Sequence, residues 1–187
     1  MEITMILGIA VGVVLLLWFV TTWNRLVRLE KDVDRAWSNI DVILKQRYDM
    51  IPNLVNTVKG YATHEKELFE QFAVARQAAA GALAQGNVAG VAAAESTLAG
   101  ILPRINMVAE QYPDLKADAA FVNLQNQIMA LENQLADRRE FYNASATTFN
   151  TAIETIPTNI VAGLKSCTER DLFEVQGIER ENVVVSF

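Results

Sequence analysis

ITMILGIAVGVVLLLWFVTTWN (residues 3–24) is an apolar run that no charged side chain interrupts between Glu2 and Arg25. At about 1.5 Å of rise per helical residue, the run extends roughly 33 Å and matches a hydrocarbon core of about 30 Å. A secretory signal peptide would need a basic start, a shorter apolar stretch and a cleavage site of small residues. The run follows Met1 and Glu2 and has no Ala-x-Ala site after it. We therefore expect residues 1–24 to be an uncleaved transmembrane anchor in a lipid bilayer.

The charges that flank the run predict its orientation. No basic side chain precedes it, and the basic side chains that follow it are Arg25, Arg28, Lys31 and Arg35. Cytoplasmic flanks of membrane helices are enriched in Lys and Arg, so we expect the N-terminus outside and the rest of the chain in the cytoplasm. Trp18 and Trp23, near the end of the run, suit a membrane interface. The single cysteine, Cys167, cannot form an intrachain disulfide and requires no oxidising compartment.

Composition predicts a helical domain after the anchor. The sequence has 16 Lys and Arg, 22 Asp and Glu, and a formal net charge of −6. An acidic chain without a basic, aromatic-rich segment is poorly suited to nucleic acid, so we expect no nucleic-acid partner. With only four Pro and nine Gly, the chain should form long helices with few breaks.

The spacing of apolar residues predicts four helices. The anchor continues as one helix over residues 24–61, because apolar side chains recur every three or four positions from Leu26 to Leu44. Similar stripes predict helices over residues 65–84, 88–111 and 114–156. Gly86 and Asn87 suit a helix stop and an N-cap, and Pro157 suits the last stop. We predict an all-α fold, in which a single transmembrane helix continues into an antiparallel, up-down four-helix bundle over residues 25–157.

The predicted helix lengths leave a surface uncovered near the membrane. The helices at 24–61 and 114–156 outrun the other two, so their membrane-proximal halves form a two-helix stem. Two helices cannot bury all their large apolar side chains, so another subunit, the C-terminal tail or a partner must cover them. The candidate self-association residues of this stem are Leu26, Leu29, Val33, Trp37, Phe141 and Phe149. Residues 158–187 are the tail, and the candidates for pairing as a strand with a neighbouring tail are Val183, Val184 and Val185.

The sequence offers no pattern for catalysis or metal binding. An HExxH zinc helix would need a second His after His64 and Glu65, at the position that Leu68 occupies. With one His and one Cys, the chain cannot form a zinc cluster by itself. Phosphate loops, a GxSxG elbow and a dinucleotide fingerprint are also lacking. We therefore expect no metal, no cofactor and no enzymatic activity.

Several polar residues fall on helix faces that should be buried. Glu132, Arg139 and Asn143 lie on one side of the helix at 114–156, within reach of Arg47 or Asp49 of the first helix. We interpret these five residues as a candidate buried polar network that fixes the register of the helices, with a ligand site as the alternative.

Several segments together resemble the LemA family. They are residues 35–42, 47–55, 58–62 with His64 and Glu65, 110–116, Leu131-Glu132-Asn133, Arg138-Arg139, Tyr142-Asn143, Asn150 and Pro157. The resemblance implies single-pass proteins of the bacterial inner membrane with a cytoplasmic, antiparallel helical bundle and no established enzymatic activity. It also implies association with membrane proteases or, in magnetosome-forming bacteria, with organelle membranes. After Pro157 the chain departs from the family, because the usual Phe-Gly-Phe-like segment and terminal Phe-Glu are not in their places.

Two functions from different classes fit these patterns. The first is a non-enzymatic scaffold or adaptor that self-associates at the cytoplasmic membrane as a homo-oligomer, and the uncovered stem supports it. The second is a regulatory or docking subunit of a membrane enzyme such as a membrane protease. A homomeric particle in mild detergent favours the first, and co-purification with an unrelated membrane enzyme at fixed stoichiometry favours the second.

Overall fold

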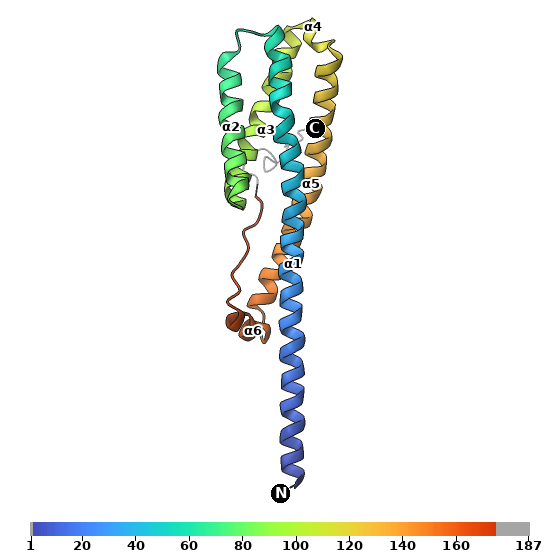
Figure 1. Ribbon diagram of the computed structural model, residues 1–187, viewed down its shortest axis with the longest axis vertical. Coiled ribbons are helices and arrows are strands. Elements are labelled where there is room, and N and C mark those ends of the chain that lie inside the picture. Colours follow the sequence, from blue (N-terminus) through green and yellow to red (C-terminus); the bar gives the residue numbers. More distant parts are fainter. Residues whose placement is uncertain (1, 175–187) are drawn as a thin grey trace, which may run out of the picture. The chain divides into compact units, whose positions relative to one another are not determined.

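The computed structural model describes residues 2–174, which contain six helices and no strand (Figure 1). The helices are α1 (Glu2–Tyr61), α2 (Lys66–Ala84), α3 (Val88–Gln111), α4 (Pro113–Lys116), α5 (Ala119–Glu154) and α6 (Thr158–Lys165). The predicted all-α fold is thereby confirmed, and the first three helices end where the sequence patterns end. Val183, Val184 and Val185 lie outside the described residues, so their pairing as a strand stays a prediction.

The chain divides into two compact units, which we describe separately. Among the described residues, the anchor unit contains residues 2–38 and Glu140–Asp171, whereas the bundle unit contains Asn39–Arg139 and residues 172–174. Both α1 and α5 therefore contribute to both units.

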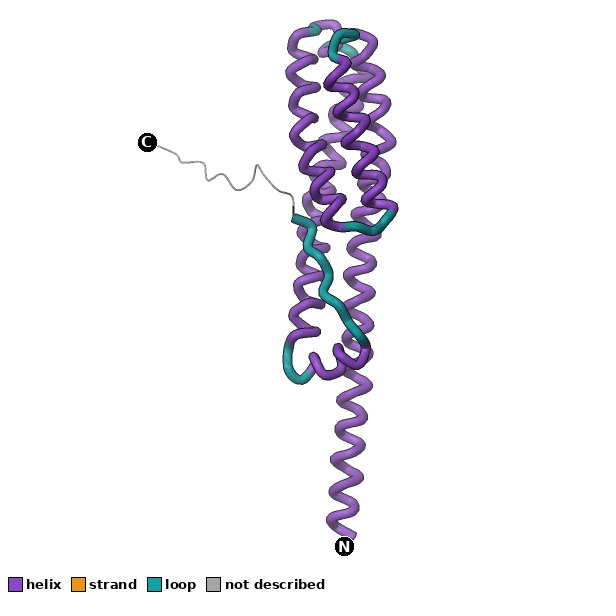
Figure 2. Tube along the Cα trace, turned by 90° about the vertical axis from the view of Figure 1, so that its left-hand side faces the viewer, coloured by secondary structure: helices purple, strands orange, loops and turns teal. Residues whose placement is uncertain are grey.

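The bundle unit has the predicted up-down arrangement of four helices, formed by α2, α3 and the adjoining parts of α1 and α5 (Figures 1 and 2). Antiparallel α1 and α2 meet at two levels, where Lys59 lies 5.3 Å from the ring centroid of Phe69 and Arg76 donates to the Tyr48 carbonyl at 2.7 Å. The buried side chains include Ile40, Leu44, Ile51, Leu54 and Val58 of α1, Leu68 and Phe72 of α2, Val91, Leu98 and Ile105 of α3, and Phe121, Ile128 and Leu135 of α5. These are the stripes that the sequence predicts, and they form one core.

The turn between α2 and α3 has the predicted helix stop and N-cap. Gly86 has a φ of +64°, and the backbone N–H groups of Gly86 and Asn87 donate to the carbonyls of Leu83 and Ala82, both at 3.0 Å. This pair of bonds closes α2 with a left-handed residue, for which glycine is best suited. The Asn87 side chain then accepts from the backbone N–H of Gly90 at 2.8 Å and caps α3.

The fourth predicted helix is interrupted near its start. The structure has the short α4 and begins α5 only at Ala119. Asp118 caps α5, because its Oδ1 accepts from the backbone N–H groups of Ala120 at 2.7 Å and Phe121 at 3.1 Å. Its Oδ2 accepts from the Tyr61 hydroxyl at 2.8 Å. These hydrogen bonds lower the pKa of the Asp118 carboxyl, and the bond from Tyr61 has the largest effect. The start of α5 is therefore fixed by a polar contact with the end of α1.

The anchor unit contains the apolar run as the first part of α1. By length and composition, α1 and α3 are the two helices of the described residues that are long and apolar enough to cross a membrane. The apolar window of α1 contains no buried residue, whereas α3 buries one face in the core of the bundle unit. A helix that is apolar on every face and lies outside a protein core has the pattern of a membrane span.

The first residues of the expected tail form α6 and turn back along the anchor unit. At the end of α6, Ser166 adopts a φ of +56°, and the N–H groups of Ser166 and Cys167 donate to the carbonyls of Gly163 at 3.1 Å and Ala162 at 3.0 Å. An irregular segment follows, drawn as the loop after α6 in Figure 2. We call residues 158–171 the C-terminal clasp, because its contacts hold it on α1 and α5.

Candidate functional site

The structure covers most of the stem surface with the chain itself. Of the six candidate self-association residues, Leu26, Val33 and Phe149 are buried, Leu29 and Trp37 are half-buried, and Phe141 is 54% exposed. The sequence leaves three covers open for the stem, namely another subunit, the C-terminal tail or a partner, and the structure shows the tail. Its helix α6 adds apolar contacts to the two helices that form the stem. Self-association of the stem stays a prediction.

The apolar contact between the clasp and the stem is a three-helix cluster. Leu26 of α1, Ala152 of α5, and Val161 and Ala162 of α6 form its buried centre. The partly buried residues around this centre are Trp18, Phe19, Trp23, Leu29, Ile153 and Cys167. Because buried apolar area contributes about 25 cal/mol per Å², this cluster attaches the clasp where the apolar run of α1 ends.

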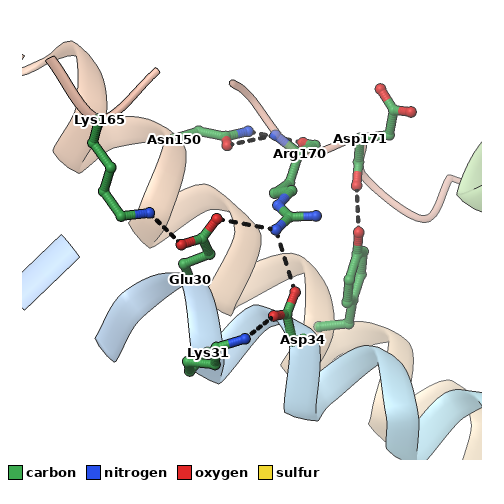
Figure 3. Close-up of polar contacts among 8 residues, drawn as sticks. Glu30, Lys31, Asp34, Asn150, Lys165, Arg170 and Asp171 are labelled. Carbon is green, nitrogen blue, oxygen red and sulfur yellow. Dashed lines mark hydrogen bonds and ion pairs between the residues drawn. The ribbon is translucent and has the colours of Figure 1, made fainter. Parts of the chain in front are cut away.

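Ion pairs join the clasp to the same face of α1 (Figure 3). Lys165 Nζ lies 2.5 Å from Glu30 Oε2, and Arg170 Nη2 lies 3.6 Å from Glu30 Oε1 and 3.2 Å from Asp34 Oδ1. The hydrogen bond to Glu30 raises the pKa of the Lys165 ammonium. The clasp thus supplies the cations and α1 the anions. Partly exposed pairs of this kind are typically worth about 0.2–1 kcal/mol each, so they determine position more than stability.

Neutral hydrogen bonds hold the clasp on α5. The Asn150 amide donates to the Arg170 carbonyl and accepts from the Arg170 backbone N–H, both at 2.9 Å. The Tyr142 hydroxyl donates to the Asp171 carbonyl at 2.8 Å, and its ring lies 5.4 Å from that of Trp37. Burial raises the pKa of Tyr142, so the hydroxyl remains a donor at neutral pH.

Sequence reasoning missed the polar residues of the clasp. Lys165 and Glu30 are 135 positions apart, and Arg170 and Asp34 are 136 apart. Neither pair follows a helical spacing, so no periodic signal connects them. Asn150 was noted only through its place in the family pattern.

The second candidate, the polar network, lies inside the bundle unit. The Arg47 side chain is 1% exposed, and its guanidinium contacts the carboxylates of Glu95 on α3 and Glu132 on α5. The Tyr48 hydroxyl donates to Glu95 at 2.6 Å. The structure therefore brings together Arg47 and Glu132, as the helix spacing suggests, and adds Tyr48 and Glu95.

Burial controls the protonation of this network. It raises the pKa of the Glu95 carboxyl, against the opposing effects of the Arg47 charge and the Tyr48 hydrogen bond. Burial and the neighbouring Glu95 also raise the pKa of Tyr48, which stays protonated and keeps donating its hydrogen bond at neutral pH. Buried groups that depend on one another in this way are costly to leave unpaired.

The other predicted members of the network differ in their surroundings. Asp49 is exposed and borders an open groove with Gln46, Met50, Gln127, Ala130, Leu131 and Gln134. The positive charge of Arg139 acts on Glu95 and opposes the rise in the pKa of that carboxyl, and its guanidinium lies 5.6 Å from the ring centroid of Phe173. Asn143 belongs to the anchor unit. Because Arg47 joins three helices through two carboxylates, the network suits a fixed helix register better than a ligand. Among residues 2–174, no group of three or more His, Cys, Asp or Glu side chains could hold a metal ion.

A second open groove lies between α2 and α3. Val74, Ala75, Ala78 and Ile101 give it an apolar floor, and Glu67 and Glu70 lie among its lining residues. Val74 is 68% exposed, so its side chain is accessible from solvent at this groove.

Comparisons with known proteins match most of the chain. A protein-family model described as the LemA family matches residues 36–187. The chain is 26% identical to the Magnetosome protein MamQ of Magnetospirillum gryphiswaldense, over 83% of this chain and 67% of that one. It is 26% identical to the Magnetosome protein MamQ 2 of Paramagnetospirillum magneticum over 81% and 64%, and 28% identical to Protein LemA of Metamycoplasma hominis over 87% and 74%. The chain thus spans about two thirds of the length of these magnetosome relatives.

Replacing Arg47 with Met should destabilise the protein strongly, because it leaves Glu95 buried without its cation. Removing one partner of a buried pair typically costs about 3–5 kcal/mol. Thermal unfolding of the detergent-solubilised full chain, followed by circular dichroism, measures the loss. Adding Glu95→Gln should restore part of it, whereas Lys45→Met, in the exposed pair with Asp41, should cost less than about 1 kcal/mol. Equal effects of Arg47→Met and Lys45→Met would contradict a buried network.

Replacing Asn150 with Ala should loosen the clasp. The variant loses both hydrogen bonds to the Arg170 backbone, each worth about 0.5–1.5 kcal/mol, so the clasp opens more often. Limited trypsin digestion should cut faster after Lys165 and Arg170, as measured by mass spectrometry. Thr147→Ala, at an exposed position of α5, is the matched control and should leave the rate unchanged. Identical cleavage of both variants would mean that Asn150 does not hold the clasp.

Proposed function

This chain belongs to the LemA family, and we propose that it is a membrane-anchored, non-enzymatic helical adaptor of the bacterial inner membrane. In this proposal the apolar run of α1 spans the bilayer with its N-terminus outside. The bundle unit then lies in the cytoplasm, where it offers binding surfaces to other membrane proteins.

The exposed first part of α1 carries the proposal. Leu7, Val14 and Leu17 are 65%, 64% and 59% exposed, and they represent a run that is apolar on all sides. Exposing such a surface to water costs about 25 cal/mol of free energy for each Å² of apolar area. A bilayer removes that cost, and the basic residues after Asn24 supply the flank that favours the cytoplasmic side.

The covered stem favours docking of a partner over self-association. A second subunit was one of the three covers expected for the stem, but five of the six candidate side chains are buried or half-buried within the chain, Leu26 and Leu29 of them in the cluster with α6. Phe141 alone of the six remains largely exposed. The α2–α3 groove, with its exposed Val74, supports the alternative in which the bundle unit docks a membrane enzyme. The names of the MamQ relatives mention a cell structure and no reaction, which supports a non-enzymatic role.

Native mass spectrometry of detergent-solubilised membranes tests this choice. We expect one copy of the chain with an unlike membrane protein at fixed stoichiometry. Val74→Arg should abolish the complex, because it places a charge on the apolar floor of the α2–α3 groove. Val122→Arg, at an exposed position of α5 outside the groove, should preserve it. A homomeric particle that Phe141→Arg dissociates would instead restore self-association.

Orientation needs a reporter other than Cys167. That thiol is half-buried against the three-helix cluster, so weak labelling would have two explanations. Gln85, which is exposed just after α2, is a better position. Gln85→Cys in a Cys167→Ser background should react with a membrane-impermeant maleimide only after the inner membrane is permeabilised. Labelling in spheroplasts with an intact inner membrane would reverse the proposed topology.

A further inference from the structure

The outward face of α6 is apolar and exposed. Ile160 and Leu164, four residues apart on α6, are 61% and 68% exposed, and Ile156, in the turn before the helix, is 78% exposed. A Cβ added at Gly163 would meet nothing within 4 Å. Residues 155–164 contain no charged side chain. The opposite face buries Val161 and Ala162. A helix on the surface of a water-soluble domain would place polar residues outward, so α6 is not patterned for water.

The contacts of α6 place it at the level where the apolar run of α1 ends. Its buried face belongs to the cluster that contains Trp18, Phe19, Trp23 and Leu26. Lys165, at its end, pairs with Glu30, the next acidic residue of α1 after the run. A hydrocarbon core of about 30 Å takes up about 20 helical residues, so a span that begins at Ile3 leaves the core near Thr22. By this measure, α6 lies at the boundary between acyl chains and headgroups.

We propose that the outward face of α6, formed by Ile160 and Leu164 and preceded by the exposed Ile156 of the adjoining turn, is a lipid contact that inserts into the same leaflet in which the α1 span ends. This inference rests on the proposed function, because it takes the apolar run of α1 as the membrane span. The occupant of the face is the headgroup and upper acyl-chain region of the bilayer. Helices that lie in this region bury an apolar face about 5–10 Å into it.

Lipid fits this face better than a protein does. Helix α6 packs on the stretch of α1 that contains Trp18, Phe19 and Trp23. In the same stretch Leu16, Leu17 and Val20 are exposed. The cations of the clasp, Lys165 and Arg170, are paired with α1 and leave the outward face uncharged. Because α1 already holds α6 at the bilayer, insertion needs no further association step, and the local concentration of lipid is high. A partner protein would have to displace that lipid.

A second membrane contact has a mechanical consequence for the adaptor. A single transmembrane helix tilts and rotates, and its interfacial side chains limit those motions. The clasp adds a second point of contact beside the first, on a different element of the same unit. The anchor unit therefore contacts the bilayer through two helices. Its tilt is then defined, whereas a unit held by one helix alone could rotate about the axis of that helix.

Fluorescence quenching by lipids tests the contact directly. Single cysteines replace Ile160, Leu164, Val14, Thr168 or Gln85 in the full chain with Cys167→Ser, and each is labelled with an environment-sensitive nitrobenzoxadiazole dye. The chains are reconstituted into phosphatidylcholine–phosphatidylglycerol vesicles without a quencher, with a lipid that carries a spin label near the headgroup end of its acyl chain, or, for Val14 in the middle of the span, with a lipid that carries the spin label near the far end of its acyl chain. Val14 reports the span, and Gln85 reports the bundle unit. Thr168 is the matched control, because it is exposed and only a few residues beyond α6.

We expect a blue-shifted emission and a loss of fluorescence by the quencher lipid at Ile160→Cys and Leu164→Cys, but neither at Thr168→Cys nor at Gln85→Cys. Quenching at Val14 without quenching at Ile160 or Leu164 would overturn the lipid contact and leave the anchor in place. Failure to quench at Val14 would remove the anchor itself, and with it the basis of this inference. A blue shift at Ile160 without lipid quenching, together with oxidative dimers of the unlabelled Ile160→Cys chain, would assign the face to a second copy and overturn the proposal. Melting curves that match the Cys167→Ser chain establish that the labelled proteins are folded.

Discussion

Helix α1 has to satisfy two different surroundings along one backbone, and both units of the structure are built on it. Its first part is apolar on every face, which suits a bilayer because a helix bonds its own N–H and C=O groups. From Leu26 onward the apolar residues narrow to a stripe, and that stripe needs protein neighbours. Leu26 packs against the clasp, and Arg47 pairs with Glu95 and Glu132. The fold follows from how each part of α1 is covered.

Local signals predicted the helices well, because helix periodicity and caps act over a few residues. The turn at Gly86 and Asn87 has both of its expected roles. The break before α5 was missed because two start signals lie close together, Pro113 and Asp118. A sequence pattern alone does not show which of them begins the long helix. In the structure both signals are used, because Pro113 begins the short α4 and Asp118, which contacts Tyr61 57 positions away, caps the long α5.

The candidate sites were predicted only where both partners follow a helical stripe. Arg47 and Glu132 could be paired in this way, whereas Glu95, in the predicted helix over residues 88–111, was not among the candidates. A signal was present, since Glu95 follows Val91 by four positions and precedes Leu98 by three, which puts a charge on a buried stripe. The sequence contains a weaker signal for the clasp. The helix α6 is eight residues long, and its value to the fold depends on contacts with residues more than 100 positions away.

The polar and apolar halves of the clasp support each other if α6 faces lipid. The pair of Lys165 and Glu30 is partly buried beside the three-helix cluster, and an ion pair gains strength as the surrounding dielectric falls. Insertion of Ile160 and Leu164 brings low-dielectric lipid close to that pair, so it strengthens the bond that holds α6 on α1. In turn, a clasp that stays closed keeps the apolar face at the depth where lipid covers it. By linkage, each event favours the other to the same extent. The closed clasp and the inserted face are therefore one state of the anchor unit, stabilised by the bilayer that α1 enters.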